Sequence, residues 1–346
     1  MSLPTHMHAA YVTAPGPAEA IRYGRIPVPV IGPTDVLVRV RLVAADPVDV
    51  FVRSGAYPTP MPSPFVIGRD LVGEVAAVGP GVAGFVQGQP VWCNSLGHAG
   101  RQGSFAEYAV VAADRLYPAP PDLDPADLVA AAHPAATAWL ALFRHGRLRA
   151  GENVHVGGGA GNVGSAAVAL AVAAGARVIA TARPEDFSSV RALGAAEVLD
   201  YRDPDLPAGL RTATPDGYHV WVDTSGHGDL ATGVGLLANG GRLVVMAGLH
   251  ATPTLPLGPL YTRDASVTGF AISNASVTDL ADAADGVVFL LRATPWRPRI
   301  ADRLPLSLAA QAHRRLENGE VNGRLVLQSA TDRIDQPIGG ARYSSA

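Results

Sequence analysis

The sequence predicts an α/β protein in which a doubly wound parallel sheet is joined to a β-rich, barrel-like domain. Two changes of pattern along the 346 residues lead to this prediction. Up to about residue 125, short apolar strands are separated by Gly and Pro, which is typical of a barrel-like sheet. Beyond that point, short apolar strands alternate with helical segments, which is typical of a parallel sheet with crossover connections.

The β-rich region begins with the clearest strand pattern. Val36–Val43 alternates apolar residues with arginine, the period of a half-buried strand. Leu71–Val78 and Ala106–Val111 are further apolar runs bounded by glycines. We therefore expect these three segments to form closely spaced strands of one sheet.

The alternating region begins at Asp124, where a capping side chain followed by Pro125 predicts the start of a helix. The strands expected after it are Val154–Val156, Val178–Ala180, Val198–Leu199, His219–Val222 and Arg242–Ala247, with helices from Val163, over Asp186–Leu193 and over Asp229–Leu237. The polar segment Asp332–Ala346 is expected to be a loosely attached tail.

Composition excludes several classes of protein. Hydrophobic residues make up 48% of the chain, too many for a disordered protein, and the net charge of −3 argues against a nucleic-acid partner. All 27 basic residues are arginine. The single cysteine, Cys93, excludes a disulfide scaffold and favours a cytoplasmic location. Val163–Ala182 is strongly apolar, but its glycines and Arg177 fit a buried helix and strand better than a membrane span.

The most informative motif is Gly159-Ala160-Gly161-Asn162-Val163-Gly164, a G-x-G-x-x-G sequence between a predicted strand and a predicted helix. In a Rossmann dinucleotide-binding domain, the first glycine (Gly159) permits the tight turn and the second (Gly161) lets the backbone approach a pyrophosphate. The third, Gly164, allows close packing of helix and strand. This context predicts a dinucleotide site at the start of the helix.

The end of the second strand indicates which dinucleotide is bound. It reads Ala180-Thr181-Ala182-Arg183, without the acidic residue that usually holds an unphosphorylated ribose. Arg183 is suited to a 2′-phosphate, so NADPH is expected, although the nearby Glu185 and Asp186 oppose that contact. The alternative is that Arg183 is only a solvated surface residue.

Several further motifs occur in a characteristic order. They are Asp46–Asp49, Arg53–Pro58, Gly68–Val75, Gly103–Tyr108, the glycine loop, Gly240–Val244 and Gly319–Leu327. Together they resemble the medium-chain dehydrogenase/reductase superfamily, and the chain is most similar to its zinc-independent quinone oxidoreductase (zeta-crystallin-like) branch. The resemblance spans about residues 8–328.

The resemblance implies a GroES-like catalytic domain made of residues 1–125 and 272–346, with a Rossmann domain of residues 126–271 inserted. It also implies that substrate lies between them. The catalytic candidates are Asp46, which would orient substrate or ribose, Tyr57, which either donates a hydrogen bond or only lines the pocket, and Thr137, which either contacts the nicotinamide or bonds its own helix backbone. The implied cofactor contacts, besides the glycine loop with Asn162 and Val163, are Thr181, Arg183, Tyr201, Gly248, Leu249, Phe270, Ala271, Asn322 and Arg324.

The resemblance further implies an NADPH-dependent reaction on a quinone or an α,β-unsaturated carbonyl compound. Zinc-containing relatives place ligands where Asp46, Arg69 and Asp70 lie and close to His133. Arg69 cannot bind a metal, which leaves an unusual Asp46/Asp70/His133 site as an alternative to no metal. Other readings are an enoyl reductase for a carrier-bound substrate and a non-catalytic, crystallin-like protein. A homodimer is expected through the edge strand Ser266–Phe270.

Overall fold

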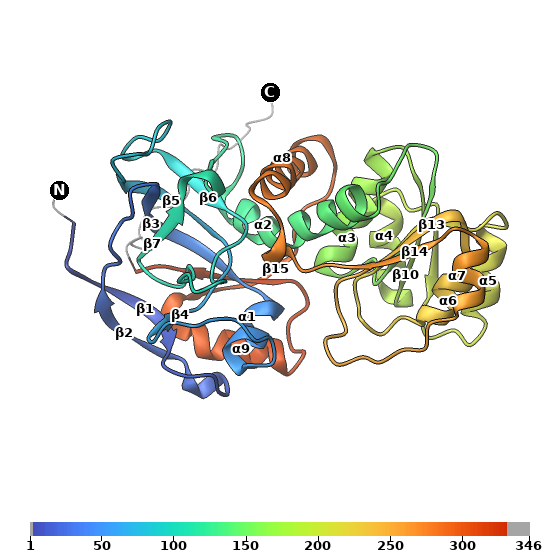
Figure 1. The fold of residues 1–346 in the computed structure, drawn as a ribbon, viewed down its shortest axis with the longest axis horizontal. Helices are drawn as coiled ribbons and strands as arrows, with labels where there is room; N and C mark the ends of the chain where they lie inside the picture. Colours follow the sequence, from blue (N-terminus) through green and yellow to red (C-terminus); the bar gives the residue numbers. More distant parts are fainter. Residues whose placement is uncertain (1–2, 331–346) are drawn as a thin grey trace, which may run out of the picture.

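A computed structural model describes residues 3–330 and contains two main sheets on either side of a group of helices (Figure 1). The first is a six-stranded sheet in the order β11-β10-β9-β12-β13-β14, and all its neighbouring strands are parallel. Its strands are β9 (Asn153–Gly157), β10 (Arg177–Ala182), β11 (Glu197–Asp200), β12 (Tyr218–Asp223), β13 (Leu237–Val245) and β14 (Ser266–Gly269). This sheet confirms the predicted Rossmann domain.

Helices cover both faces of this sheet. They are α3 (Asn162–Ala173), α4 (Phe187–Ala192), α5 (Leu206–Ala213), α6 (Leu230–Gly235) and α7 (Leu257–Thr262). One apolar core joins the sheet to α3 and α4, and a second lies on the opposite face around Trp221 and Leu210. Both faces are buried, which explains why the strands are short apolar runs rather than alternating ones.

The second sheet has seven strands and includes antiparallel pairs. It runs β15-β16-β3-β5-β6-β8, with β7 also paired to β3. The strands are β3 (Asp35–Ala45), β5 (Leu71–Val78), β6 (Pro90–Cys93), β7 (Tyr108–Ala112), β8 (Tyr117–Pro118), β15 (Ile300–Pro305) and β16 (Arg324–Gln328); a smaller sheet holds β1 (His6–Val12), β2 (Arg22–Pro27) and β4 (Phe65–Val66). The strands from the two ends of the chain thus share one sheet, and the predicted strands of the β-rich region are confirmed.

Helix α2 (Pro125–Trp139) lies between the sheets, beside α8 (Val277–Ala293) (Figure 1). It begins as predicted, because the Asp124 side chain accepts hydrogen bonds from the amides of Ala126 and Asp127. With the π-helical turn that follows, Pro125–His145 is long and apolar enough to cross a membrane, but 83% of its most apolar window is buried in the protein. It is therefore placed as a core helix.

Two short helices complete the part of the molecule that contains the second sheet, which the resemblance assigns to the catalytic domain and which is hereafter the catalytic side. These are α1 (Pro47–Ser54) and α9 (Ala309–Glu317), which contact one another. The tail expected over Asp332–Ala346 lies outside the described residues.

Candidate functional site

The glycine-rich loop joins β9 to α3. The motif predicted the tight turn at Gly159. In the structure the left-handed residue is Gly158, with a φ of +75°, so the turn falls one residue earlier. The Gly159 N–H donates to the Thr181 carbonyl oxygen at 2.8 Å, which ties the loop to β10. A Cβ on Gly164 would lie 2.0 Å from the Gly158 carbonyl oxygen, so close packing at the third glycine is confirmed.

The first turn of α3 faces outward from this loop. No side chain caps it at Gly161, so its free N–H groups and its positive dipole end remain available to an anion. A Cβ on Gly161 would meet only the Gly158 carbonyl oxygen within 4 Å, at 3.3 Å, which leaves room for a ligand beside the backbone. Asn162 turns its side chain aside and donates to the Gly323 carbonyl oxygen at 3.1 Å.

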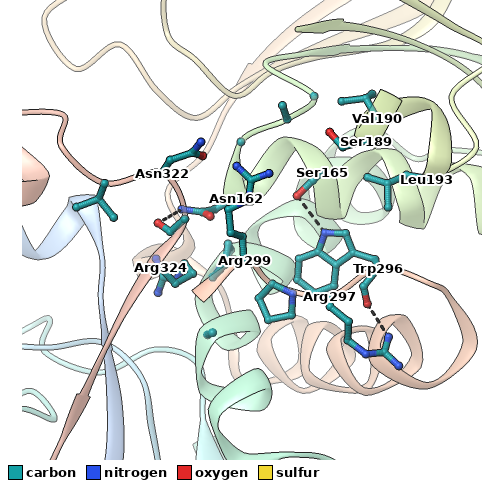
Figure 2. A pocket seen from close by; sticks show the side chains of 18 residues that line it. Asn162, Ser165, Ser189, Val190, Leu193, Trp296, Arg297, Arg299, Asn322 and Arg324 are labelled. Carbon is teal, nitrogen blue, oxygen red and sulfur yellow. Dashed lines mark hydrogen bonds between the residues drawn. The ribbon is translucent and has the colours of Figure 1, made fainter. Parts of the chain in front are cut away.

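A cavity of about 260 Å³ opens against this loop (Figure 2). Besides residues of α2 and around α4, two segments from late in the chain line it, Trp296–Arg299 and Val321–Arg324, and they belong to the part of the chain that returns to the catalytic side. Trp296 closes one wall by donating from its indole N–H to the Ser165 hydroxyl at 3.0 Å. The structure therefore brings Asn322 and Arg324, both predicted to contact a cofactor, beside the glycine loop.

The end of β10 holds a second group of predicted residues. Arg183 donates to the Asp186 carboxylate at 2.9 and 3.1 Å and lies 3.4 Å from the Glu185 carboxylate. Tyr201, at the end of the adjacent β11, is half exposed and lies beneath the Arg202 guanidinium. Arg183 and Tyr201 thus share one edge, where acidic neighbours already engage the arginine.

A buried ion-pair network lies at the start of α1, on the other side of the cavity. Arg324 binds the Asp46 carboxylate at 2.8 Å and lies 3.6 Å from the Asp70 carboxylate, and all three side chains are at most 2% exposed. Burial would raise the pKa of Asp46, but the charge of Arg324 and its hydrogen bond to the carboxylate oppose that effect, and the pKa of Asp46 lies below the usual value. Asp46 is predicted to orient substrate or ribose, and in the structure its buried carboxylate binds Arg324.

The same network continues to Asp49 and Arg69. Asp49 accepts a hydrogen bond from the Asp46 backbone N–H at 2.9 Å and lies 3.7 Å from the Arg69 guanidinium. Burial and the Asp46 charge raise the pKa of Asp49 to about 8, against the opposite effect of Arg69. Burial and the charge of Asp46 likewise raise the pKa of Asp70. The network therefore contains two permanent cations, one ionised carboxylate and two carboxyl groups that tend to hold protons.

Helix α2 contributes His133 and Thr137. The Thr137 hydroxyl donates to the His133 carbonyl oxygen at 2.8 Å. Its proton is therefore bound within the helix, which is the backbone bond that was one of the two expectations for Thr137. The His133 Nδ1 lies 3.3 Å from the Asn94 carbonyl oxygen. Burial lowers the pKa of His133, partly opposed by Asp46, so the imidazole is neutral at pH 7.

The remaining predicted residues lie in three places. Tyr57 lines a separate, mostly apolar cavity of about 430 Å³ with several prolines and Met61. Gly248 has a φ of +85° and packs against Gly226, while Leu249 beside it is exposed. Phe270 stacks on His145 with ring centroids 4.4 Å apart, next to Ala271.

Comparison with known proteins decides the family. Residues 32–121 match the alcohol dehydrogenase GroES-like domain, and residues 162–286 match the family described as zinc-binding dehydrogenase. The quinone oxidoreductase of Mus musculus is 31% identical over 306 residues, which cover 87% of this chain and 91% of the mouse protein. The chain belongs to the medium-chain dehydrogenase/reductase superfamily, in its quinone oxidoreductase branch. It is accordingly an oxidoreductase that uses a nicotinamide cofactor.

Solved structures agree with this assignment. An NAD-dependent alcohol dehydrogenase is 33% identical, with a TM-score of 0.82 over 93% of this chain and 99% of that one. Mycobacterial Rv1454c, solved in complex with NADPH, is 27% identical, with a TM-score of 0.80 over 93% of this chain and 99% of that one. Both nicotinamide dinucleotides thus occur among similar structures.

The family description names zinc, but the side chains of this protein at the corresponding place do not fit a zinc ion. Arg69 has no lone pair for a metal, and Arg324 already binds the carboxylates of Asp46 and Asp70. Among residues 3–330, no three His, Cys, Asp or Glu side chains are grouped to hold a metal ion. The donor set at this place is therefore that of an ion-pair network and not of a tetrahedral zinc site.

Sequence reasoning missed the Trp296–Arg299 segment. It lies far along the chain from the glycine loop and carries no recognised motif, so only the fold shows that it lines the same cavity. The two arginines in Trp296-Arg297-Pro298-Arg299, placed just before the closing strands, were the one available signal.

Proposed function

We propose that this protein transfers hydride from NADPH to a quinone or an α,β-unsaturated carbonyl compound without a catalytic metal. The observation that carries the proposal is the buried Arg324–Asp46 ion pair, which engages a carboxylate at a position where the resemblance places a zinc ligand in zinc-containing relatives. Oxidation of a simple alcohol needs a Lewis acid to stabilise its alkoxide. A quinone or enone spreads the developing charge by conjugation, so it needs less help from the protein.

In this proposal the nicotinamide supplies the hydride, and the chain supplies binding and orientation. The uncapped first turn of α3 binds the pyrophosphate. Phe270 and Gly248 line the nicotinamide end, in keeping with their counterparts in the family. Tyr57 and its apolar cavity receive the acceptor, which is consistent with a flat, weakly polar substrate.

The preference for NADPH rests on the end of β10. No acidic side chain occupies the last residues of that strand, where a carboxylate would repel a 2′-phosphate. Arg183 follows directly, and Arg202 lies close by over Tyr201. The similarity to Rv1454c, solved with NADPH, supports the same choice.

The proposal is tested by titrating metal-analysed protein with NADPH and NADH, followed by cofactor oxidation with quinone and enone panels. We expect tighter binding of NADPH, less than one zinc for every ten chains, and turnover on at least one panel. Stoichiometric zinc that turnover requires would overturn the metal-free part. Cofactor binding without turnover on either panel would overturn the acceptor class and favour a carrier-bound substrate or a non-catalytic protein.

Partners and location are part of the same proposal. We propose a homodimer, because β14 is an edge strand and large apolar side chains of α7 beside it, Leu257 and Tyr261, are 66% and 74% exposed. The net charge of −3 supports a small-molecule partner over nucleic acid. The single, buried cysteine supports a cytoplasmic location.

A further inference from the structure

The cavity at the glycine loop is lined by positively charged side chains and, among the described residues, by no acidic one. Two arginines, Arg299 and Arg324, supply this charge, whereas Arg297, which also lines the cavity, donates its guanidinium N–H to the backbone oxygens of Thr294 and Trp296. The free N-terminal end of the twelve-residue helix α3 adds further positive potential.

Arg299 lies on the segment that leads from α8 into β15. Its backbone carbonyl oxygen accepts a hydrogen bond from the Arg324 N–H at 2.7 Å, so the segment is held beside β16. Its side chain is exposed and lies next to Asn162 at the start of α3 (Figure 2). Within residues 3–330, no hydrogen bond or ion pair holds the Arg299 guanidinium.

This placement favours an anion between Arg299 and the start of α3, because both are positive. Cations stabilise the C-terminal end of a helix and are repelled by the N-terminal end. Arg324, only 2% exposed, also lines the cavity, and its Nε and Nη2 atoms have no hydrogen-bond partner in the described chain. Three kinds of donor thus face one cavity: the Arg299 guanidinium, the unused donors of the buried Arg324 and the uncapped amides of α3. Together they form the donor set of a phosphate site.

We propose that Arg299 binds the pyrophosphate of the nicotinamide dinucleotide. This cation comes from the segment between α8 and β15, on the catalytic side. The inference rests on the nicotinamide cofactor and extends it to a residue outside the Rossmann sheet. The pyrophosphate is common to NADPH and NADH, so Arg299 acts equally on both. In this respect it differs from Arg183, whose proposed contact is the 2′-phosphate.

The test compares Arg299→Ala and Arg299→Lys with the control Arg297→Ala. Arg297 lines the same cavity, but its guanidinium donates to the backbone oxygens of Thr294 and Trp296 and lies away from the loop (Figure 2). Dissociation constants for NADPH and NADH are measured by nicotinamide fluorescence, and inhibition constants for ADP-ribose and adenosine by competition. Circular dichroism confirms that each variant is folded.

We expect Arg299→Ala to raise the Kd of NADPH and NADH alike by about tenfold, the loss of one charge-assisted contact. ADP-ribose should weaken equally and adenosine should not, Arg299→Lys should recover part of the loss, and Arg297→Ala should change each Kd less than about twofold. Unchanged affinity in Arg299→Ala, or a loss confined to NADPH, would overturn the assignment. If the wild type binds neither dinucleotide, it is the proposed function that fails, which distinguishes the two results.

Discussion

At the end of β10, the Arg183 guanidinium is shared between Glu185 and Asp186, which a 2′-phosphate has to displace. The Glu185 side chain is 57% exposed and can turn into water at little cost, whereas Asp186 makes the closer contact. In the proposed function, cofactor choice at this edge is therefore a competition between one phosphate and one carboxylate for the same arginine.

We predict that Arg183→Ala raises the Kd for NADPH about tenfold and leaves that for NADH within about twofold, because only NADPH carries the 2′-phosphate. Asp186→Asn should have the opposite effect and tighten NADPH, since it removes the competing charge. Fluorescence titration of both variants with both cofactors measures this. Equal effects on the two cofactors would contradict a 2′-phosphate role for Arg183.

The buried network at α1 makes stability depend on pH. The pKa of Asp49 is raised to about 8 in the folded protein, while an unfolded aspartate titrates near 4. The native state therefore holds a proton that the unfolded chain has released, so this stability is present at low pH and is lost as the pH rises toward 8. Burial lowers the pKa of His155 and His313 to about 3, so both imidazoles are neutral at the pH values at which Asp49 loses its proton.

We predict that between pH 6.5 and 8 the wild type loses up to about 1.4 kcal/mol of unfolding free energy per pH unit relative to Asp49→Asn. The asparagine keeps an oxygen to accept the hydrogen bond from the Asp46 N–H. Urea unfolding of both proteins at four pH values gives the difference. Parallel pH profiles would show that Asp49 is ionised in the folded state.

At the scale of the element, the loop before α3 depends on contacts between backbone atoms. A Cβ on Gly164 would collide with the Gly158 carbonyl oxygen, which is backbone and cannot rotate away. By contrast, a Cβ on Gly258, in the short helix α7, would meet nothing within 4 Å. The two glycines therefore form a matched pair that separates steric need from helix propensity.

We predict that Gly164→Ala costs about 1–3 kcal/mol of stability and raises the Kd of both dinucleotides at least tenfold, because helix and strand must separate. Gly258→Ala should leave binding unchanged and be neutral or slightly stabilising. Thermal unfolding and cofactor titration measure both effects. Normal binding by a folded Gly164→Ala protein would contradict the packing argument.

At the scale of the whole molecule, α2 connects the two sheets through a shared core. The same apolar cluster contains Ala44 and Trp92 of the catalytic side and Val156 and Val220 of the parallel sheet. Cofactor bound at the glycine loop thus lies beside elements of both regions, which are coupled by packing. The parallel sheet still ends at β14, whose outer edge no strand within residues 3–330 covers.

We predict that the protein in solution has twice the 35.7 kDa mass of its chain, through pairing of β14 edges. Val267→Pro, in the middle of β14, should shift it toward monomer by removing a backbone donor and bending the edge. Light scattering after size-exclusion chromatography measures the mass, with Val86→Pro on an exposed loop as the control. A monomeric wild type would contradict the dimer.

Much of the fold was predictable because its signals are local. The alternation in Val36–Val43 became β3, the Asp124 cap started α2, and the glycine motif lies between β9 and α3. Strand periodicity, capping and the packing of Gly164 depend on residues close together in sequence, whose backbone preferences act before distant segments meet.

Arrangement between distant segments was decided only by the tertiary structure. The resemblance assigned Asp46 to substrate or ribose and Arg324 to the cofactor, and only folding shows that the two side chains are also buried against each other, since a buried charge needs a partner. It likewise gave no reason to connect Arg299 with the glycine loop, whose turn lies at Gly158. The amino-acid pattern by itself determined the family, the two sheets and the nucleotide loop; the ion pairs and the cavity arose from contacts that exist only once the ends of the chain close on one sheet.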